Sequence, residues 1–226
     1  MRSCVGAIAA RGSPCERLSL EDDRLFDDAA FASEPRAEDN ARYERPAIRA
    51  VAGDVKGLDV VDVGCGGGEH ALWLLERGAR VVALDANPQM VELARRRLAP
   101  DVDVRLHDLR EPLPLQKEHF HLIFSSLTLH YVREWEPLLR EFRRVARPGG
   151  ALVFSTHHPC RGLHDGLGVD YFSTGLVIDS QARYWRRPLQ AIVSAVVDTG
   201  WRIERIVEPR TAEAVDPWFL IIRATR

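Results

Sequence analysis

The chain has 226 residues, a formal net charge of −2 at pH 7 and a hydrophobic content of 46%. This length is enough for one α/β domain with a full hydrophobic core. A net charge so close to zero leaves no electrostatic footprint for nucleic acid or for an anionic membrane, and no apolar run approaches the ~20 residues that span a bilayer. We therefore expect neither a nucleic acid nor a membrane as partner.

Residues 1–35 are predicted to form a poorly ordered leader. Residues 5–10 faintly resemble the apolar core of a signal peptide, but this core is at the short limit and Arg-Gly-Ser-Pro follows at once. An over-long start-codon assignment would give the same pattern. The four cysteines lack the spacing of a metal site or of a disulfide framework, which favours a reducing cytoplasm. They are Cys4, Cys15, Cys65 and Cys160.

A helix and a buried strand are predicted next. Residues 36–52 show a helical pattern around Pro46, and Gly53 follows as a stop signal. The apolar run Leu58–Val63 is rich in valine and has no polar alternation, so it predicts a buried strand.

A glycine cluster follows this strand and leads into a helical pattern that begins near Glu69. Glycines let the backbone turn sharply and leave no side chain to block a ligand. A second buried strand, Arg80–Leu84, ends in Asp85. A glycine loop before a helix, with an acid about twenty residues further on, is typical of a nucleotide site, in which the acid accepts hydrogen bonds from ribose hydroxyls.

The glycine spacing distinguishes between two classes of ligand. A dinucleotide site needs Gly-x-Gly-x-x-Gly, so that a pyrophosphate can sit at the helix N-terminus. Counted from Gly64, the third glycine would fall at Glu69, which places an acid where a phosphate would bind. An NAD(P)-dependent oxidoreductase is therefore the less favoured alternative.

The pattern that is present reads Asp62-x-Gly64-x-Gly66-x-Gly68, with Asp85 after the second strand. It resembles motifs I and II of the class I S-adenosylmethionine-dependent methyltransferases. The resemblance implies S-adenosyl-L-methionine as cofactor and S-adenosyl-L-homocysteine as product. This ligand carries a sulfonium cation and no phosphate, so acids around the loop are electrostatically tolerable.

The resemblance continues after the next two strands. Asp108 and Leu109 follow a third predicted strand, Val102–Leu106, and match motif III, in which the acid binds the adenine amino group and its neighbour packs on the ring. The segment Ser125–His130 leaves a fourth strand and resembles motif IV in its small-molecule form. The cofactor-binding residues that we carry over are Tyr43, Asp62, Gly64, Cys65, Gly66, Gly68, Asp85, Ala86, Met90, Asp108, Leu109 and Ser125.

The rest of the chain supports an α/β fold. Asn87 and Pro88 mark a helix start, with Leu93 and Leu98 on its apolar stripe. The later predicted elements are helix Glu134–Ala146, a turn at Arg147–Gly150, strand Ala151–Ser155, helix Leu189–Thr199, and strands Trp201–Glu208 and Pro217–Ala224. Together they predict a doubly wound, Rossmann-like sheet of seven strands, mostly parallel with an antiparallel C-terminal strand. We expect residues 36–226 to form one methyltransferase domain, with a cap insertion at about 157–188.

Histidines that follow strands four and five are candidate general bases, because a neutral imidazole accepts protons near neutral pH. We place His158 and His157 slightly above His130, since they open the predicted cap. No metal is expected, because the histidines and Cys160 with His164 match no zinc spacing.

The predicted cap carries candidate substrate contacts. These are the aromatic walls Tyr171, Tyr184 and Trp185, and an arginine pair, Arg186 and Arg187, that could hold a substrate carboxylate. We expect a cytoplasmic monomer or homodimer that methylates a small organic molecule at oxygen or nitrogen, with carbon as a further option. A protein that binds S-adenosylmethionine without methylating is the other alternative.

Overall fold

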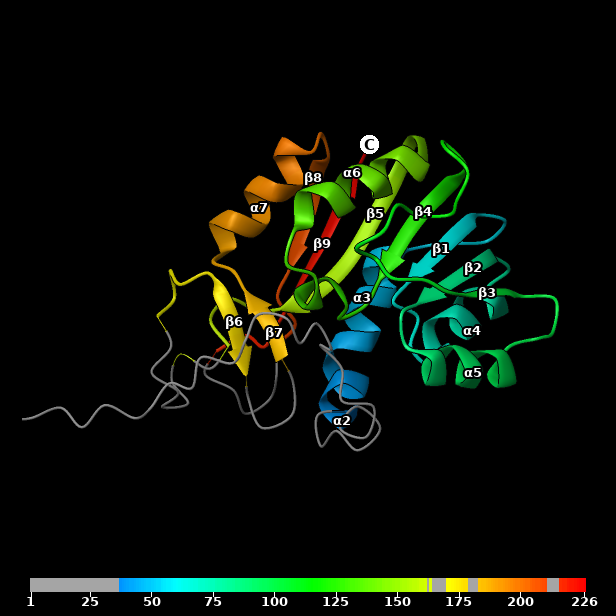
Figure 1. Ribbon diagram of the computed structural model, residues 1–226, viewed down its shortest axis with the longest axis horizontal. Coiled ribbons are helices and arrows are strands. Elements are labelled where there is room, and N and C mark those ends of the chain that lie inside the picture. The colour runs from blue at the N-terminus through cyan, green and yellow to red at the C-terminus, as the bar shows by residue number, and fades with distance from the viewer. Residues whose placement is uncertain (1–36, 162, 164–169, 179–182, 211–215) are drawn as a thin grey trace, which may run out of the picture.

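The computed structural model describes residues 37–161, 163, 170–178, 183–210 and 216–226, so the predicted leader lies outside the described residues. A seven-stranded sheet in the order β3-β2-β1-β4-β5-β9-β8 forms the centre of the fold (Figure 1). Its strands are β1 (Asp59–Val63), β2 (Arg80–Asp85), β3 (Asp103–Leu106), β4 (Phe120–Ser125), β5 (Ala146–His157), β8 (Arg202–Val207) and β9 (Phe219–Thr225). A separate hairpin pairs β6 (Gly175–Ile178) with β7 (Arg183–Arg186).

The strand directions confirm the predicted fold class. β1 pairs in parallel with β2 and β4, β2 with β3, and β4 with β5, whereas β9 runs antiparallel to both β5 and β8. The parallel strands are nearly continuous apolar runs because helices cover both of their faces. Their carboxyl ends meet at one edge of the sheet, where ligands bind in open α/β folds.

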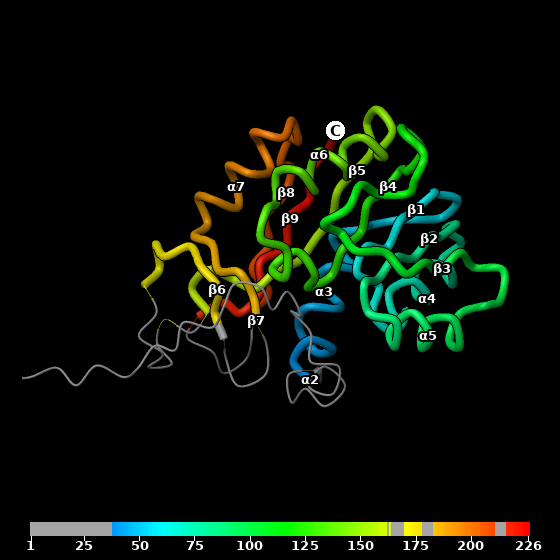
Figure 2. Tube along the Cα trace, in the orientation of Figure 1, coloured from blue at the N-terminus to red at the C-terminus, as the bar shows by residue number. Residues whose placement is uncertain are grey.

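Helices lie on both faces of the sheet, which can be followed along the chain in Figure 2. They are α2 (Ala37–Asp39), the π-helix η1 (Asn40–Glu44), α3 (Arg45–Ala52), α4 (Glu69–Glu76), α5 (Pro88–Arg97), the 3₁₀ turn η2 (Leu129–Tyr131), α6 (Trp135–Val145) and α7 (Leu189–Asp198). One core cluster joins α6 and α7 to the sheet, and the other joins α3, α4 and α5. The fold is therefore doubly wound, as predicted.

The predicted N-terminal helix is divided into three pieces. Pro46 has no N–H and sits in the first turn of α3, a position that tolerates proline. Before it, the chain forms the π-helix η1, in which Arg45 N donates to Asn40 O. α3 ends at Gly53, whose φ of +76° suits glycine. Single-turn π-segments are rare and frequently lie at functional sites.

Two local predictions need correction. The predicted turn Arg147–Gly150 belongs to β5, because the pairing of β4 with β5 shifts register between Phe120 and Leu122 and so accommodates the extra residues. Leu93 does not join the core stripe of α5: it is 42% exposed, and its side chain lies against Gly67 of the glycine loop.

The predicted start of α5 is confirmed. Asn87 Oδ1 accepts hydrogen bonds from Gln89 N (2.8 Å) and Met90 N (3.4 Å), which caps the helix before Pro88.

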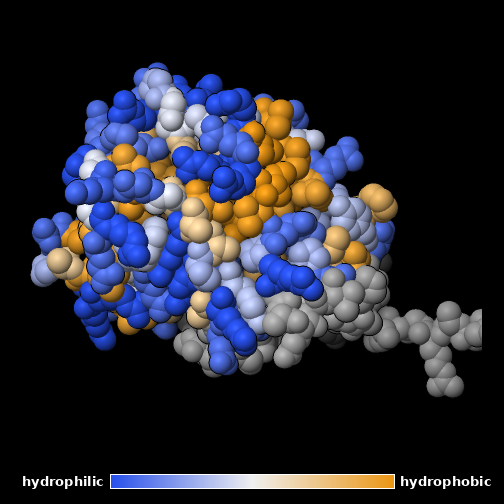
Figure 3. All heavy atoms as spheres, turned by 180° about the vertical axis from the view of Figure 1, so that it is seen from behind, coloured by the Kyte–Doolittle hydropathy of each residue, from blue (hydrophilic) through white to orange (hydrophobic). Residues whose placement is uncertain are grey.

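The surface of the described residues is mostly hydrophilic. The rear face shows one concentrated apolar area within a hydrophilic surround (Figure 3). The large hydrophobic residues most exposed among those described are Leu93, Leu106, Phe172, Leu176, Val197 and Ile206. Of the helices described, none combines the length and the apolar character that crossing a membrane requires.

Candidate functional site

The glycine loop between β1 and α4 turns at Gly64. The N–H groups of Gly64 and Cys65 both donate to Leu84 O, at 2.8 and 2.9 Å, which fastens the loop to β2. Gly64 has a φ of +73°, and a Cβ placed there would lie 2.1 Å from Thr128 Oγ1. No side chain fits at this position, because the segment after β4 occupies the space.

Asp85 at the end of β2 holds the tip of the same loop. Its carboxylate accepts hydrogen bonds from Gly66 N (2.7 Å) and from Asn87 N (2.9 Å). Burial raises the pKa of Asp85, and these two N–H groups oppose the rise. A Cβ built on Gly66 would meet nothing within 4 Å, so open space lies beside the loop. The acid predicted from motif II is therefore in contact with the glycines of motif I.

Asp62 in β1 is a buried acid with spare hydrogen-bonding capacity. It is 1% exposed, and its Oδ2 has no hydrogen-bond partner among the residues that the structure describes. Burial and, second, the charge of Asp85 raise the pKa of Asp62 to about 7, whereas a hydrogen bond from the Ala71 backbone lowers it. A buried carboxyl with an unused oxygen suits a ligand that donates a hydrogen bond or carries positive charge.

The first residues of α4 complete this half of the site. Glu69, at the position of the missing third glycine, forms ion pairs with Arg45 and with Arg97 (3.5 Å). His70 packs against Phe124 with ring centroids 5.0 Å apart, and its buried Nδ1 has no partner in the described part of the chain. Burial lowers the pKa of His70 to about 3, so the ring is neutral.

The predicted adenine contacts, Asp108 and Leu109, follow β3 and contact other parts of the protein. Asp108 is held by Arg110, whose Nη2 lies 2.6 Å from its Oδ2, and this contact lowers the pKa of the acid. Leu109 is buried in the core cluster of α6 and α7. The pairing with Arg110 uses the same carboxylate that the resemblance assigns to adenine, so that role stays a prediction.

The remaining predicted cofactor residues differ in placement. Ser125 is fully buried, and its Oγ donates to Val63 O at 2.8 Å. Cys65 is also buried, whereas Ala86 is exposed and Met90 is half-buried on α5. Tyr43 is half-buried in η1, with the Arg42 guanidinium 5.3 Å from its ring centroid. The structure thus brings together the loop, Asp62 and Asp85, and places the others around them or in the core.

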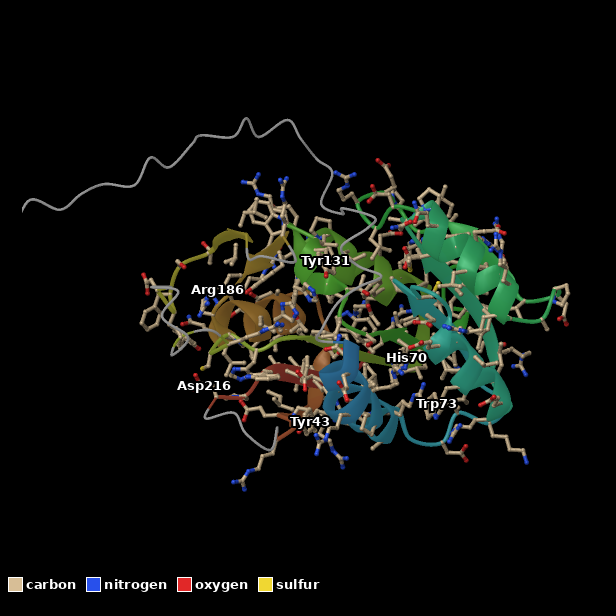
Figure 4. The ribbon with its side chains drawn as sticks, turned by 90° about the horizontal axis from the view of Figure 1, so that it is seen from below. Tyr43, His70, Trp73, Tyr131, Arg186 and Asp216 are labelled. Atoms are coloured by element: carbon tan, nitrogen blue, oxygen red, sulfur yellow. The ribbon has the colours of Figure 1, made fainter. Side chains whose placement is uncertain are left out.

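A second group of side chains lies at the carboxyl ends of β4 and β5. Figure 4 shows the molecule from below and labels Tyr43, His70, Tyr131 and Arg186, which come from separate elements. The cavity here has a volume of about 20 Å³, which is room for about one water molecule. Its lining is His130, Trp135, Thr156, His157, His158, Pro159, Arg161, Tyr184, Trp185, Arg186, Arg187 and Ile192.

Two of the candidate histidines are stacked. The rings of His130 and His157 lie 3.9 Å apart with an interplanar angle of 16°, and Tyr184 meets His157 edge-on at 4.7 Å. His130 is 2% exposed, and neither of its ring nitrogens has a hydrogen-bond partner within the described residues. Burial, and then the charges of Arg161 and Arg187, lower the pKa of His130 to about 3. It is therefore neutral and a weak base.

His158 is held on both sides of its ring. Cys160 N donates to Nδ1 at 3.0 Å, and Nε2 lies 2.7 Å from Glu208 Oε1. The tautomer that satisfies both contacts carries its proton on Nε2. Neither nitrogen is then available to accept another proton.

The two arginines of the hairpin fasten it to the strand-end loops. Arg186 donates to Pro159 O (2.5 Å) and Arg161 O (3.3 Å). Arg187 donates to Val132 O (2.7 Å), and burial lowers its pKa to about 10. Its guanidinium also lies 4.7 Å from the ring centroid of Trp135. Within the described residues, their hydrogen bonds go to backbone carbonyls, so binding of a substrate carboxylate stays a prediction for both.

Of the other two aromatic candidates, Trp185 also lines the cavity, whereas Tyr171 precedes the hairpin in the chain. Trp185 is half-buried under the Arg133 guanidinium, which lies 5.1 Å from its ring centroid, and the hydroxyl of Tyr171 accepts a hydrogen bond from Leu189 N at 3.2 Å. Among the described residues, no cluster of three or more histidine, cysteine and acidic side chains could hold a metal ion, and His164 lies outside them.

Sequence reasoning missed Glu44. This acid is 1% exposed, and its Oε1 accepts hydrogen bonds from Ser126 Oγ (2.9 Å) and Ser155 Oγ (2.5 Å). Burial raises its pKa. In the sequence it stands among charged residues and resembles a solvated helix position, so only the fold reveals its partners.

The comparisons with known proteins agree with this geometry. Residues 61–154 match the model of a family described as a methyltransferase domain. The crystal structure of an S-adenosylmethionine dependent methyltransferase from Mesorhizobium loti has a TM-score of 0.73 and 32% identity to this chain, over 81% of this chain and 97% of that one.

Two curated relatives match over shorter stretches. The malonyl-[acyl-carrier protein] O-methyltransferase of Serratia marcescens is 40% identical over 100 residues, which are 44% of this chain and 38% of that protein. An uncharacterized protein of Haemophilus influenzae is 31% identical over 132 residues, 55% of this chain and 52% of its own length. The chain thus spans 38% and 52% of these two proteins but 97% of the Mesorhizobium loti enzyme, and it belongs to the S-adenosylmethionine-dependent methyltransferases.

Proposed function

We propose that this protein transfers a methyl group from S-adenosylmethionine to a small organic acceptor, at oxygen or nitrogen, with carbon as a further option. The observation that carries the proposal is the placement of two half-sites on one edge of the sheet. The glycine loop with Asp62 and Asp85 forms the first, which we call the cofactor half-site. The stacked pair His130 and His157 belongs to the second, which we call the acceptor half-site.

The residues present fit the cofactor. Open space beside Gly66 leaves room for a ligand against the loop backbone. The unpartnered Oδ2 of Asp62 offers a buried acceptor to a positively charged ligand, and Asp85 is placed to accept ribose hydroxyls. When bound, the cofactor supplies an electrophilic methyl group. The acids of this chain contribute the negative potential that attracts the cation.

The lining of the acceptor half favours a small organic molecule, and its cavity of about 20 Å³ must widen to admit one. Aromatic walls with a few polar groups are typical of small-molecule sites. We propose that residues 157–188, which include the hairpin β6–β7, act as a cap over this site within a single domain. The malonyl-[acyl-carrier protein] relative methylates an oxygen, but its alignment covers too little of that protein to assign the same acceptor here.

We further propose that His157 is the proton acceptor in this site. His158 has both nitrogens engaged, and His130 has a pKa near 3, which leaves His157 as the remaining candidate of the three. Holding the acceptor beside the cofactor should lower the activation barrier more than the proton transfer does, since alignment alone can lower a barrier by roughly 7–11 kcal/mol.

The dinucleotide alternative is disfavoured by the ion pairs of Glu69. An acid that is already paired with Arg45 and Arg97 stands where a pyrophosphate would need backbone N–H groups and a third glycine. A protein that binds the cofactor and transfers nothing would keep the first half-site alone. A pooled-metabolite assay distinguishes a protein that only binds the cofactor from one that also transfers its methyl group.

Two measurements test the proposal. Calorimetry with S-adenosylhomocysteine should show binding, and Asp85→Asn should weaken it by about tenfold or more, because the two N–H groups bind different carboxylate oxygens and asparagine places an NH2 donor where one of those oxygens stood. Asp54→Asn is the matched control, since Asp54 also accepts a backbone N–H two residues ahead, from Lys56 at 3.0 Å, but is exposed. With labelled cofactor and pooled metabolites, mass spectrometry should then detect an acceptor that gains one methyl group. Well-folded protein that does not bind the product would refute the proposal.

A further inference from the structure

Glu44 is a buried acid that neither half-site described above uses. It comes from the π-helix η1 and reaches the carboxyl ends of β4 and β5, far away in the sequence. It is 1% exposed, and the charged groups nearest to it are Arg45 and Arg49. A buried carboxylate is costly unless its hydrogen bonds are specific, so its partners are informative.

One chain of hydrogen bonds leads from Glu44 to a strained turn. Leu127 N donates to Ser155 Oγ at 2.9 Å, and Ser155 Oγ donates its single proton to Glu44 Oε1. Leu127 has a φ of +49°, in the left-handed region that side chains other than glycine rarely adopt. Glu44 is therefore the final acceptor of the hydrogen bonds that hold this conformation.

The same turn touches the glycine loop. Thr128 Oγ1 lies 2.9 Å from Ser126 O and 3.3 Å from Gly64 O, and Ser126 Oγ donates to Glu44. The turn then continues into η2, which carries His130 against His157. Residues 126–128 thus connect the cofactor half-site to the acceptor half-site.

The N-terminal segment is also anchored on the other side of the loop. Arg45 pairs with Glu69, and Arg49 Nη2 donates to Glu69 O at 3.2 Å. Two neighbouring residues of one segment, Glu44 and Arg45, therefore hold the post-β4 turn and the first residue of α4.

We propose that Glu44 is a positioning residue for methyl transfer, which acts through Ser126 and Ser155 to fix the turn 126–128 between the glycine loop and the stacked histidines. This inference rests on the proposed function for its meaning. Glu44 should also affect cofactor binding, because Thr128, whose hydroxyl contacts Gly64 O, lies in the turn that Glu44 fixes.

Calorimetry with S-adenosylhomocysteine on purified full-length protein tests the role. Glu44→Ala should weaken binding by about tenfold, since the hydroxyls of Ser126 and Ser155 lose their common acceptor and Ser155 Oγ, which accepts from Leu127 N, is no longer held in place. Glu44→Gln should stay within about threefold of the unchanged protein, because an amide oxygen still accepts both bonds. Glu38→Ala, an exposed acid of the same segment, is the matched control and should leave binding unchanged.

A double-mutant cycle separates this role from simple loss of packing. Ser155→Ala removes the middle of the same chain, so the affinity loss of Glu44→Ala with Ser155→Ala should be close to that of the larger single loss. If Glu44→Ala does not fold, Ser155→Ala alone tests the role, and it should weaken the binding of S-adenosylhomocysteine. The inference would be overturned if the two single losses were additive, or if Glu44→Gln and Glu44→Ala lost the same affinity. Unchanged binding in a folded Glu44→Ala protein would also overturn it.

The outcomes also separate this inference from the proposed function. If the unchanged protein fails to bind S-adenosylhomocysteine, the proposed function fails, and the positioning role fails with it. If the unchanged protein binds and methylates but the Glu44 variants behave like Glu38→Ala, only the positioning role is lost.

Discussion

The two half-sites of this protein are built in different ways. The cofactor half uses residues that are close in sequence: Asp62, the glycine loop and Asp85 lie within one strand–helix–strand unit, and backbone N–H groups hold the acids in place. The acceptor half joins His130, His157 and Tyr184 from three separate elements. Local geometry therefore fixes the first, whereas the second depends on the packing of distant segments.

Because of this difference, the two halves should respond differently to amino-acid substitutions. In the cofactor half, a Cβ added at Gly64 would clash with the side chain of Thr128. In the acceptor half, arginine side chains from the hairpin hold the loops through contacts with backbone carbonyls. We expect substitutions in the first half to abolish binding, and substitutions in the second to change turnover or stability while cofactor binding persists.

Gly64→Ala should give the largest effect. Its Cβ would lie 2.1 Å from Thr128 Oγ1 at a φ of +73°, so the loop must move away from β4 or the protein must unfold. We expect loss of S-adenosylhomocysteine binding by about a hundredfold or more, measured by calorimetry. Gly57→Ala has the same φ of +73° with nothing within 4 Å, and should cost only about 1–2 kcal/mol of stability. Similar behaviour of the two variants would contradict the steric account of the loop.

His157→Asn should next distinguish the two halves. If His157 accepts the proton, its loss lowers kcat by about 10²–10⁴-fold. The dissociation constant of S-adenosylhomocysteine should remain unchanged, because the residue lies outside the cofactor half. His158→Asn is the comparison, since both nitrogens of His158 already have partners. A larger loss of turnover in His158→Asn than in His157→Asn would overturn the assignment of His157.

The pH dependence of stability should report on Asp62. Its pKa is raised from 3.8 to about 7, so between these values the folded state holds a proton that the unfolded state has lost. Stability should therefore be greatest below this window and fall as the pH rises through it, by at most about 4 kcal/mol. Urea unfolding of the ligand-free protein between pH 4 and 8 measures the slope, and Asp62→Asn should flatten it. An unchanged slope in that variant would assign the effect to other groups, such as Asp85 or Glu44.

Arg187→Ala should give the smallest effect on binding and a moderate one on stability. The variant leaves Val132 O without its donor and exposes Trp135, at a cost of about 1–3 kcal/mol in thermal unfolding. S-adenosylhomocysteine should bind as before. Arg183→Ala on the same strand is the control and should be milder. Weakened binding in Arg187→Ala would show that the two halves are coupled through the hairpin.

Much of the first half could be predicted from the sequence. The glycine spacing, the acid after β2 and the Asn87 cap are local signals, and each specifies a backbone conformation within a few residues. The seven strands of the sheet and its antiparallel last strand also agreed with the prediction. The start of β5 was missed because a bulge depends on its partner strand, which no local pattern reveals.

The sequence by itself determined which strands are buried, where the glycine loop turns and which acids stand at strand ends. These are properties of periodicity and backbone freedom, and they act over short distances along the chain. Only the tertiary structure decided that Glu44 meets Ser126 and Ser155, that His158 is engaged at both nitrogens and that His130 stacks on His157. Hydrogen bonds and burial depend on which distant segments meet, and that pairing is a result of the whole packed fold.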